Sequence, residues 1–248
     1  LAGHIAIAKS VKDFNLSRVI TFHNRVRSAK KFSEDHPVIL GCLPEDSRSI
    51  KKSMSSYVSG DMSAKSRNIE INKLRNLGDN EIGILSNARC LSEGVDVPTL
   101  DGIAFLDPRS SQVDIIQAVG RAIRKSDSKS LGYIILPIYL ANSEDIDEEA
   151  LESRFRDIWK IILAMKSQDD SLKETLDCLR VEIGRGGSAP SHGSALDKII
   201  IDLPDKINSN FADHIRTILV KNTTESWDEK FGQLLHFVDQ NGHANPLQ

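Results

Sequence analysis

Short apolar, β-branched runs alternate with amphipathic stretches over the first 140 residues, and this alternation restricts the fold more than any other feature. The expected strands lie at residues 18–22, 57–60, 82–87, 102–107 and 132–140, and the expected helices at 23–36, 63–77 and 111–124. Strands that alternate with helices of this length are typical of βαβ units. The sequence therefore predicts an α/β fold with a mainly parallel sheet flanked by helices. In such sheets, ligands bind at the carboxyl ends of the strands.

After Leu140 the pattern becomes helical, which predicts a smaller helical extension. Helices are expected at residues 142–167, 170–183, 211–220 and 227–240, with Ser143 as a candidate cap of the first. A Gly/Ser-rich stretch near 184–194 has the composition of a linker, and it lacks the Gly-Lys-Ser/Thr ending of a phosphate loop. The predicted domains are residues 1–140, 141–222 with this linker, and 223–248.

The expected helix 111–124 carries one polar stripe. Gln117, Arg121 and Arg124 fall within roughly 60° of one another at about 100° per residue, opposite an apolar face. Gly120 lies in the middle of this helix at a cost of about 1 kcal/mol relative to alanine, which suggests a close approach by backbone or ligand. Arginines on a rigid element suit phosphate, because the planar guanidinium offers paired donors. A plain solvated face is the alternative interpretation.

A loop with Gly94 and Asp96 follows the expected strand 82–87, in the stretch "SEGVDVP". Glycine allows a tight turn or a close approach to a ligand, and an aspartate can accept hydrogen bonds from a ribose hydroxyl. A tight loop with a turn-forming aspartate explains the same residues. The loop alone does not decide between these two interpretations.

Taken together and in this order, the stretches resemble the second RecA-like domain of superfamily 2 helicases and translocases. "SEGVDVP" is similar to motif V of that family and "QAVGRAIR" to motif VI, while "VITFHNRVRSAKKF" resembles motif IV. "YVSGDMSAKSR" resembles the segment that follows motif IV. The resemblance covers roughly residues 17–137 and is specific because four pieces occur in the expected order. It implies a RecA-like sheet and a nucleic-acid-dependent ATPase.

The resemblance also implies roles for individual residues. Arg124 would be an arginine finger, Arg121 would contact the region of the γ-phosphate, and Gln117 would position the phosphate or the attacking water. Asp96, with Gly94, would meet the ribose or couple nucleotide to nucleic acid. A further set would contact the backbone of a DNA or RNA strand: Arg25, Ser59, Gly60 and Asn87. ATP and Mg²⁺ would be held mainly by an N-terminal RecA-like domain of the same protein, which is therefore an expected partner.

Two departures limit what the chain can do by itself. Ala88 stands where the family usually has threonine, which removes a hydroxyl that would hold a nucleic-acid phosphate. The chain also lacks a Gly-Lys-Ser/Thr phosphate loop and a strand that ends in an Asp-Glu pair. We therefore expect no ATP hydrolysis by this chain alone. Two other hypotheses stay open: the translocase part of a restriction-type enzyme, and a degenerate motor that serves as a nucleic-acid-binding or scaffolding module.

The last expected helix and its ending resemble the start of a helicase-associated repeat. The matching positions are Trp227, Leu234, Phe237, Gly242, His243 and Pro246. An ordinary amphipathic helix would give a similar pattern. Because the chain begins with Leu1 and stops where the repeat would continue, the sequence favours an excised or processed fragment of a longer protein.

Composition adds constraints on partners and compartment. Residues 1–135 hold 20 basic and 15 acidic residues, so this half is mildly basic within a chain of net charge −3. No apolar run reaches the roughly 18 residues of a membrane span, so no membrane partner is expected. Cys42, Cys90 and Cys178 show no metal-ligand spacing and fit reduced, buried thiols of an intracellular, cytoplasmic protein. The scattered histidines make a metal site unexpected.

Overall fold

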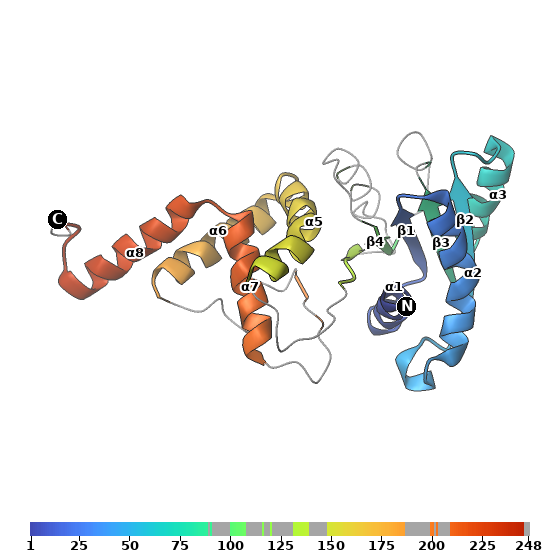
Figure 1. The fold of residues 1–248 in the computed structure, drawn as a ribbon, viewed down its shortest axis with the longest axis horizontal. Helices are drawn as coiled ribbons and strands as arrows, with labels where there is room; N and C mark the ends of the chain where they lie inside the picture. Colours follow the sequence, from blue (N-terminus) through green and yellow to red (C-terminus); the bar gives the residue numbers. More distant parts are fainter. Residues whose placement is uncertain are drawn as a thin grey trace. The chain divides into compact units, whose positions relative to one another are not determined.

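The computed structural model describes residues 1–88, 90, 100–107, 116, 120, 131–138, 148–186, 199–200, 202 and 209–245. The chain divides into two compact units, residues 1–140 and 141–248, and each is described here by itself. The first unit contains the strands and the second is helical (Figure 1). The change occurs where the sequence pattern changes.

Five parallel strands form the sheet of the first unit, in the order β2-β3-β1-β4-β5. Their bounds are β1 Arg18–His23, β2 Lys52–Ser59, β3 Glu81–Ala88, β4 Gly102–Phe105 and β5 Tyr133–Ile135. The prediction of a mainly parallel sheet flanked by helices is confirmed. The expected run 57–60 is only the end of β2, because the rest of this edge strand is polar and half-buried and lacks an apolar signal.

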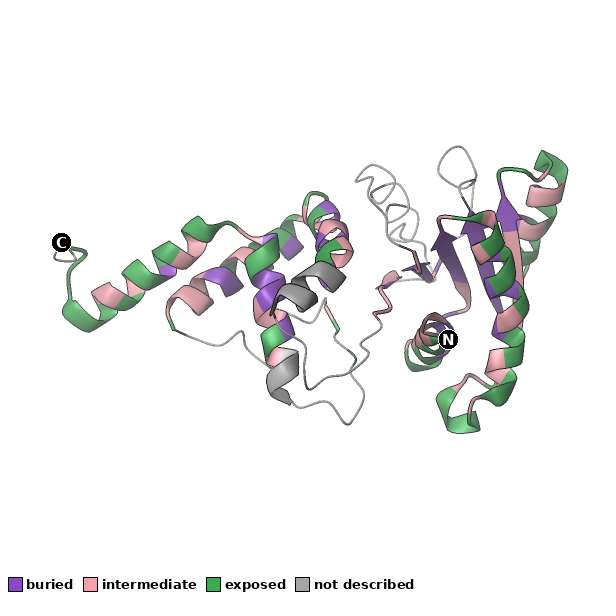
Figure 2. Ribbon diagram, in the orientation of Figure 1, coloured by how far each residue is buried: buried purple, intermediate pink, exposed green. Residues whose placement is uncertain are grey.

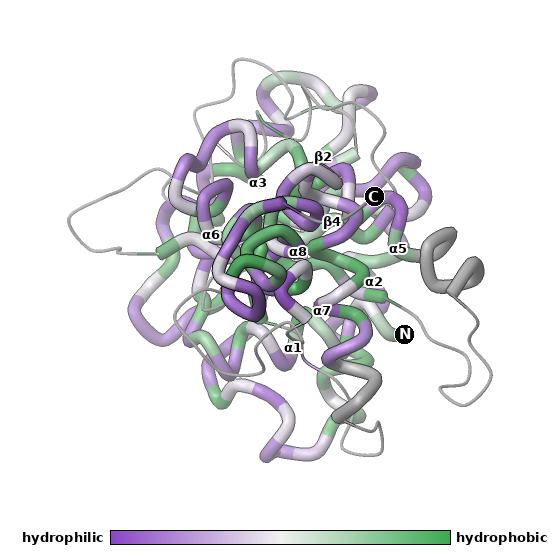
Figure 3. Tube along the Cα trace, turned by 90° about the vertical axis from the view of Figure 1, so that its left-hand side faces the viewer, coloured by the Kyte–Doolittle hydropathy of each residue, from purple (hydrophilic) through white to green (hydrophobic). Residues whose placement is uncertain are grey.

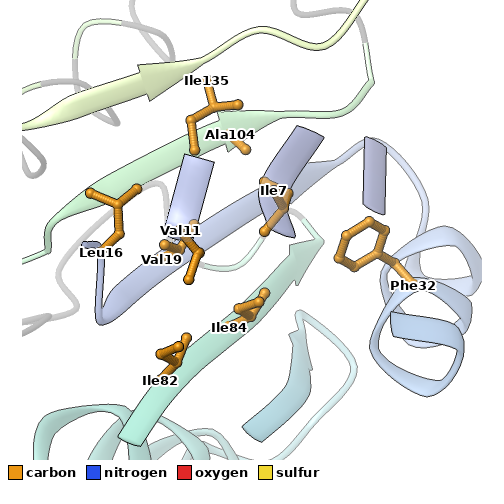
Figure 4. Close-up of a cluster of buried hydrophobic side chains, with 9 residues drawn as sticks. All are labelled: Ile7, Val11, Leu16, Val19, Phe32, Ile82, Ile84, Ala104 and Ile135. Atoms are coloured by element: carbon orange, nitrogen blue, oxygen red, sulfur yellow. The ribbon is translucent and has the colours of Figure 1, made fainter. Parts of the chain in front are cut away.

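Among the described helices of this unit, two pack on one face of the sheet and a third packs on the other. α1 (Ala2–Asp13) and α2 (Val26–Cys42) share a core with the sheet, as Figure 4 shows. The core residues are Ile7, Val11, Leu16, Val19, Phe32, Ile82, Ile84, Ala104 and Ile135. α3 (Ala64–Arg75) lies on the other face, where the side chains of Leu74 and Leu77 fill the space beside Gly83. Each large core side chain stabilises the fold by about 1.5–3 kcal/mol relative to exposure.

α1 was not expected from the sequence, and an aromatic stack holds it on α2. The His4 ring lies parallel to Phe32 with centroids 4.0 Å apart. The Nδ1 atoms of His4 and His36 are 3.1 Å apart, and both rings are buried. One ring therefore donates and the other accepts. Burial lowers the pKa of both rings, which favours their neutral forms.

The described residues of the second unit include α5 (Glu148–Lys166), α6 (Asp170–Gly184), α7 (Ser209–Thr223) and α8 (Ser226–Asn241). α6 and α8 approach backbone to backbone, because a Cβ on Gly232 would overlap the carbonyl oxygen of Val181 and one on Gly184 would overlap that of Glu229. The buried Arg180 on α6 pairs with Glu229 on α8 at 2.7 Å. Gly184, expected at the start of a linker, thus belongs to α6, and residues 187–194 lie outside the described residues.

α8 is exposed over much of its length (Figure 2), and hydrophobic and hydrophilic residues alternate along it (Figure 3). Trp227, Phe231 and Leu234 occupy one stripe and are 65%, 38% and 37% exposed. Gly242 ends the helix in the left-handed region with φ 73°, and the ring of His243 packs edge-on against Phe237. Pro246 lies outside the described residues. The helicase-associated repeat stays a prediction.

No helix in the described part of the chain is both long enough and apolar enough to cross a bilayer. The three cysteines are free, but the prediction that they are buried is wrong: Cys42 and Cys178 are exposed and Cys90 is half-buried. Cys42 is the last residue of α2, and Cys178 lies on a surface position of α6, so neither position faces a core.

Candidate functional site

The carboxyl edge of the sheet gathers the expected strand-contacting residues. Arg25 follows β1, Ser59 ends β2 and Gly60 follows it, while Asn87 is the penultimate residue of β3. The carboxyl ends of β1, β2 and β3 lie side by side, because His23 and Ser59 both pair with Ala88. Positions 25, 59, 60 and 87 therefore meet at one edge although they are up to 62 residues apart in the sequence.

Two of these positions face solvent. Arg25 is exposed and immediately precedes α2, whose first turn contains no acidic residue and receives no side-chain cap. Gly60 is exposed, and a Cβ there would have no described heavy atom within 4 Å. An arginine beside the free N–H groups of a helix start creates a positive, open surface that suits an anion.

The other two positions are buried. Ser59 is 2% exposed and Asn87 is 1% exposed, so neither side chain presents a surface to a ligand in this structure. Asn87 instead accepts hydrogen bonds through Oδ1 from the Cys90 backbone N–H at 3.2 Å and from its Sγ at 3.1 Å. Asn87 thereby fixes the chain that leaves β3. Direct contact of Ser59 and Asn87 with a nucleic-acid strand stays a prediction.

Cys90 is a thiol rather than a thiolate in this environment. Burial raises the pKa of Cys90 to about 11, although the nearby positive charge of Arg67 acts to lower it. A thiolate is the reactive form of cysteine, so the structure gives Cys90 a local packing role.

A polar network lies beneath the edge, inside the sheet. Thr21 Oγ1 donates to Ser86 Oγ at 3.1 Å, and His23 Nε2 lies 2.9 Å from the same Thr21 oxygen. All three side chains are buried. Because the Thr21 hydroxyl proton goes to Ser86, His23 Nε2 is the donor in its own bond. Ala88 is also fully buried, in register with His23, at the position where the family carries threonine.

The sequence reasoning missed one residue at this edge, Asp107. Its Oδ2 accepts the backbone N–H of Asn24 at 2.8 Å and so joins the exit of β4 to the turn after β1. The only available signal was an aspartate directly after an apolar strand. Its partner is 83 residues away in the sequence, so the pairing was not visible there.

The nucleotide-facing candidates lie outside the described residues: Gly94, Asp96, Gln117, Arg121 and Arg124. Within the expected motif VI helix, Ile116 and Gly120 are helical. A Cβ on Gly120 would meet no described atom within 4 Å, so no described part of this chain makes the expected close approach there. The described residues hold no cluster of three or more His, Cys, Asp or Glu side chains that could bind a metal.

Known proteins resemble this chain in sequence and in structure. Residues 6–126 match the helicase conserved C-terminal domain family. A protein of African swine fever virus (isolate Tick/South Africa/Pretoriuskop Pr4/1996) named "Probable helicase" is 37% identical over 93 residues, which is 38% of this chain and 10% of the viral protein. The match therefore spans about a tenth of that relative.

A solved structure of the ATP-dependent Type ISP restriction-modification enzyme LlaBIII bound to DNA is also similar. It has a TM-score of 0.60 and 27% sequence identity, and the similarity covers 85% of this chain and 14% of the enzyme. The RecA-like fold prediction is confirmed by this similarity. The first unit contains 140 of the 248 residues, which is less than 85% of the chain, so the similarity extends into the helical unit.

Proposed function

Because residues 6–126 match the helicase conserved C-terminal domain family, we propose that the chain is the C-terminal motor half of a nucleic-acid-dependent ATPase. The observation that carries the proposal is the match of residues 6–126 to this family. The match lies in the unit whose strands end close to the residues expected to contact nucleic acid. Arg25 and Gly60 offer an exposed, positive edge to the backbone of a DNA or RNA strand. Such contacts position a strand without reading its sequence.

The second part of the proposal concerns the nucleotide. Arg124 acts as the arginine finger, Arg121 binds near the γ-phosphate, Gln117 orients the phosphate or water, and Asp96 with Gly94 meets the ribose. Support comes from their order and spacing in the family motifs and from the helical state of Gly120 between them. Phosphoryl transfer spreads negative charge over the equatorial oxygens, which guanidinium groups supplied across a domain interface stabilise.

The proposal assigns most of the ATP and Mg²⁺ contacts to an N-terminal RecA-like domain of the same protein. The sequence of this chain has no Lys-bearing phosphate loop, and its described residues have no carboxylate cluster for a metal. Opening and closing of the cleft between two such domains would move the protein along a strand. The chain alone would not hydrolyse ATP.

Substitution of Arg124 by alanine tests the arginine finger. In the protein that carries both motor domains, we expect Arg124→Ala to lower nucleic-acid-stimulated kcat by about 10³-fold or more, because the transition state loses its external charge. Steady-state phosphate release in the presence of saturating DNA or RNA measures the change.

Three results of this experiment are informative. Unchanged turnover in Arg124→Ala would show that the finger assignment is wrong. Hydrolysis by the 248-residue chain alone would contradict the half-site proposal. A two-domain protein that binds nucleic acid but never turns over ATP would favour the degenerate-motor hypothesis, which the buried Ala88 in place of threonine supports.

A translocase of the restriction type is the second candidate function. The similarity to the Type ISP enzyme favours it, because that similarity covers 85% of the chain and so includes part of the helical unit. ATP-driven displacement of a third DNA strand without separation of a duplex would support the translocase. Separation of a duplex under the same conditions would support a helicase.

A further inference from the structure

Two aspartates on either side of β4 bind the backbone of β1 at its two ends. At the amino end, Asp101 Oδ2 accepts the N–H groups of Ser17 and Arg18, each at 2.8 Å. At the carboxyl end, Asp107 Oδ2 accepts the N–H of Asn24 at 2.8 Å. The two contacts use the same chemistry on the same pair of strands. Only the second lies at the candidate site.

The Asp107 contact begins where the ladder between β1 and β4 ends. Phe22 pairs with Phe105, and the Leu106 N–H donates to the Phe22 carbonyl at 3.2 Å. Asn24 lies beyond this last ladder bond, so its N–H needs an acceptor from elsewhere. A carboxylate is a strong acceptor for a backbone N–H, because a charged hydrogen bond is roughly twice as strong as a neutral one.

Asp107 therefore controls the turn that carries Arg25. Asn24 directly precedes Arg25, and α2 begins at Val26. With the Asn24 amide fixed to β4, the peptide before Arg25 has one orientation relative to the sheet edge. Loss of this bond would remove one restraint on the two residues between β1 and α2.

We propose that Asp107 is a positioning residue for nucleic-acid binding, which acts by holding the Asn24–Arg25 turn through the Asn24 N–H. The inference rests on the proposed function, because it assumes that Arg25 contacts a strand backbone. Asp107 itself does not touch the strand. It reduces the freedom that Arg25 would otherwise lose on binding.

The direction in which loss of the Asp107 carboxylate changes nucleic-acid affinity distinguishes a positioning role from a purely electrostatic one. Asp107 is negative and lies near the proposed path of a polyanion. If it acted only through its charge, its removal would strengthen binding, because repulsion between like charges would fall. Positioning predicts the opposite: loss of the carboxylate weakens binding even though a repulsive charge disappears.

Fluorescence anisotropy with fluorescein-labelled oligothymidylate and oligouridylate, at low salt, provides the test on the 248-residue chain. We expect Arg25→Ala to raise Kd about fivefold to tenfold, as for the loss of one charge-assisted contact. Asp107→Ala should raise Kd by about threefold or more, while Asp107→Asn, which keeps an acceptor oxygen, should bind at least as well as the unmodified chain. The double variant Arg25→Ala/Asp107→Ala should be no weaker than Arg25→Ala within about twofold, because the two residues act as one unit.

Asp101→Ala is the matched control. It removes the same kind of bond at the opposite end of the same strands, so it should lower the urea midpoint of the chain while leaving Kd within about twofold.

Asp107→Ser replaces Asp107→Ala in the test if the alanine variant does not fold. The serine hydroxyl oxygen lies one bond closer to the backbone than the carboxylate oxygens, so it does not reach the Asn24 N–H. The expected Kd of Asp107→Ser is that of Asp107→Ala.

The outcomes distinguish failure of the positioning role of Asp107 from failure of the proposed function. If the alanine or serine variant at position 107 binds as tightly as the unmodified chain, while Arg25→Ala still weakens binding, the positioning role is wrong and the proposed function stands. If Asp101→Ala weakens binding as much as Asp107→Ala, the effect is one of general stability and the inference also fails. If the unmodified chain binds neither oligonucleotide, the proposed function is contradicted and the inference falls with it.

Discussion

The buried pair His4 and His36 makes the stability of the first unit depend on pH. Burial, and then the charge of His4, lower the pKa of His36 to about 4. The pKa of His4 is also lowered, first by burial and then by the N-terminal amine; Lys31 lowers it further and Asp35 opposes the shift. The Nδ1–Nδ1 hydrogen bond needs one unprotonated acceptor nitrogen, so it is lost when both rings are protonated, and burial disfavours the charged form of each ring.

We expect the chain to lose stability as the pH falls from about 6.5 to 4. The unfolded state binds the proton at the ordinary pKa of 6.5 and the folded state only near 4, so stability is full above this window and is lost within it. A shift of this size corresponds to roughly 3 kcal/mol. Urea unfolding followed by far-UV circular dichroism at pH 7.5 and 5 measures it.

His36→Gln should weaken the pH dependence, because the group whose pKa falls to about 4 is gone and His4 alone of the pair remains. The matched control is His236→Gln, which replaces an exposed histidine on α8 and should leave the profile unchanged. Equal urea midpoints for the unmodified chain at both pH values would contradict the assignment.

The sequence predicted residues of the site only where a local signal existed. Arg25 and Gly60 were assigned to the site through the resemblance of their stretches to helicase motifs, and each follows an apolar run that predicts a strand. Asp107 and the histidine pair were not predicted, because their partners are 83 and 32 residues away in the sequence. Such contacts exist only after the sheet has brought distant segments together.

At the scale of elements, the crossing of α6 and α8 depends on two glycines that leave room for backbone contact. Gly184 and Gly232 each face a carbonyl oxygen of the opposite helix. The Arg180–Glu229 ion pair then fixes the angle between the helices from a largely buried position. The large side chains of α8, Trp227 and Phe231, lie on another stripe and are exposed.

Gly232→Ala should destabilise the helical unit by about 2 kcal/mol, because the added methyl group overlaps the Val181 carbonyl and forces the helices apart. Tryptophan fluorescence during urea unfolding is the measurement, since Trp159 lies in α5 and Trp227 in α8. Gln233→Ala, at the next and exposed position, should change stability by less than about 0.5 kcal/mol. A gain in stability for Gly232→Ala, as expected for an open helical position, would refute the close crossing.

Elements were predicted best where they are apolar and periodic. β1 and β3 were visible as buried runs. The polar start of the edge strand β2 was not visible, because one of its sides has no neighbouring strand and its side chains are mostly half-buried. α1 was not predicted, although Ile7 and Val11 belong to the core; its stacking on α2 through His4 gives no hydrophobic signal in the sequence.

At the scale of the whole molecule, each unit has a core of its own. The first unit buries the set around Ile7, Val19 and Phe32. The second buries Phe155, Trp159, Leu172, Leu176, Leu179, Ile215 and Leu219. Compact units with separate cores can unfold as separate cooperative transitions.

We expect urea unfolding curves from tryptophan fluorescence and from far-UV circular dichroism to differ. The chain has two tryptophans, both in the helical unit, so fluorescence reports on that unit alone, whereas circular dichroism reports on both. Asp101→Ala should shift the unfolding transition of the first unit, which circular dichroism detects, and should leave the fluorescence transition unchanged, because Asp101 lies in the first unit. Superimposable curves that shift together in this variant would show that the two units unfold as one.

The position of β1 in the middle of the sheet has a consequence for the making of the protein. β1 ends at His23, yet its two neighbours in the sheet, β3 and β4, follow later in the sequence and begin at Glu81 and Gly102. At 5–20 residues per second, roughly 60 residues of synthesis separate β1 from its first partner, an interval on the order of several seconds. During that time the backbone N–H and C=O groups of β1 have no neighbouring strand to pair with. A translational pause before β4 has emerged from the ribosome would therefore lengthen the time for which both edges of β1 are unpaired.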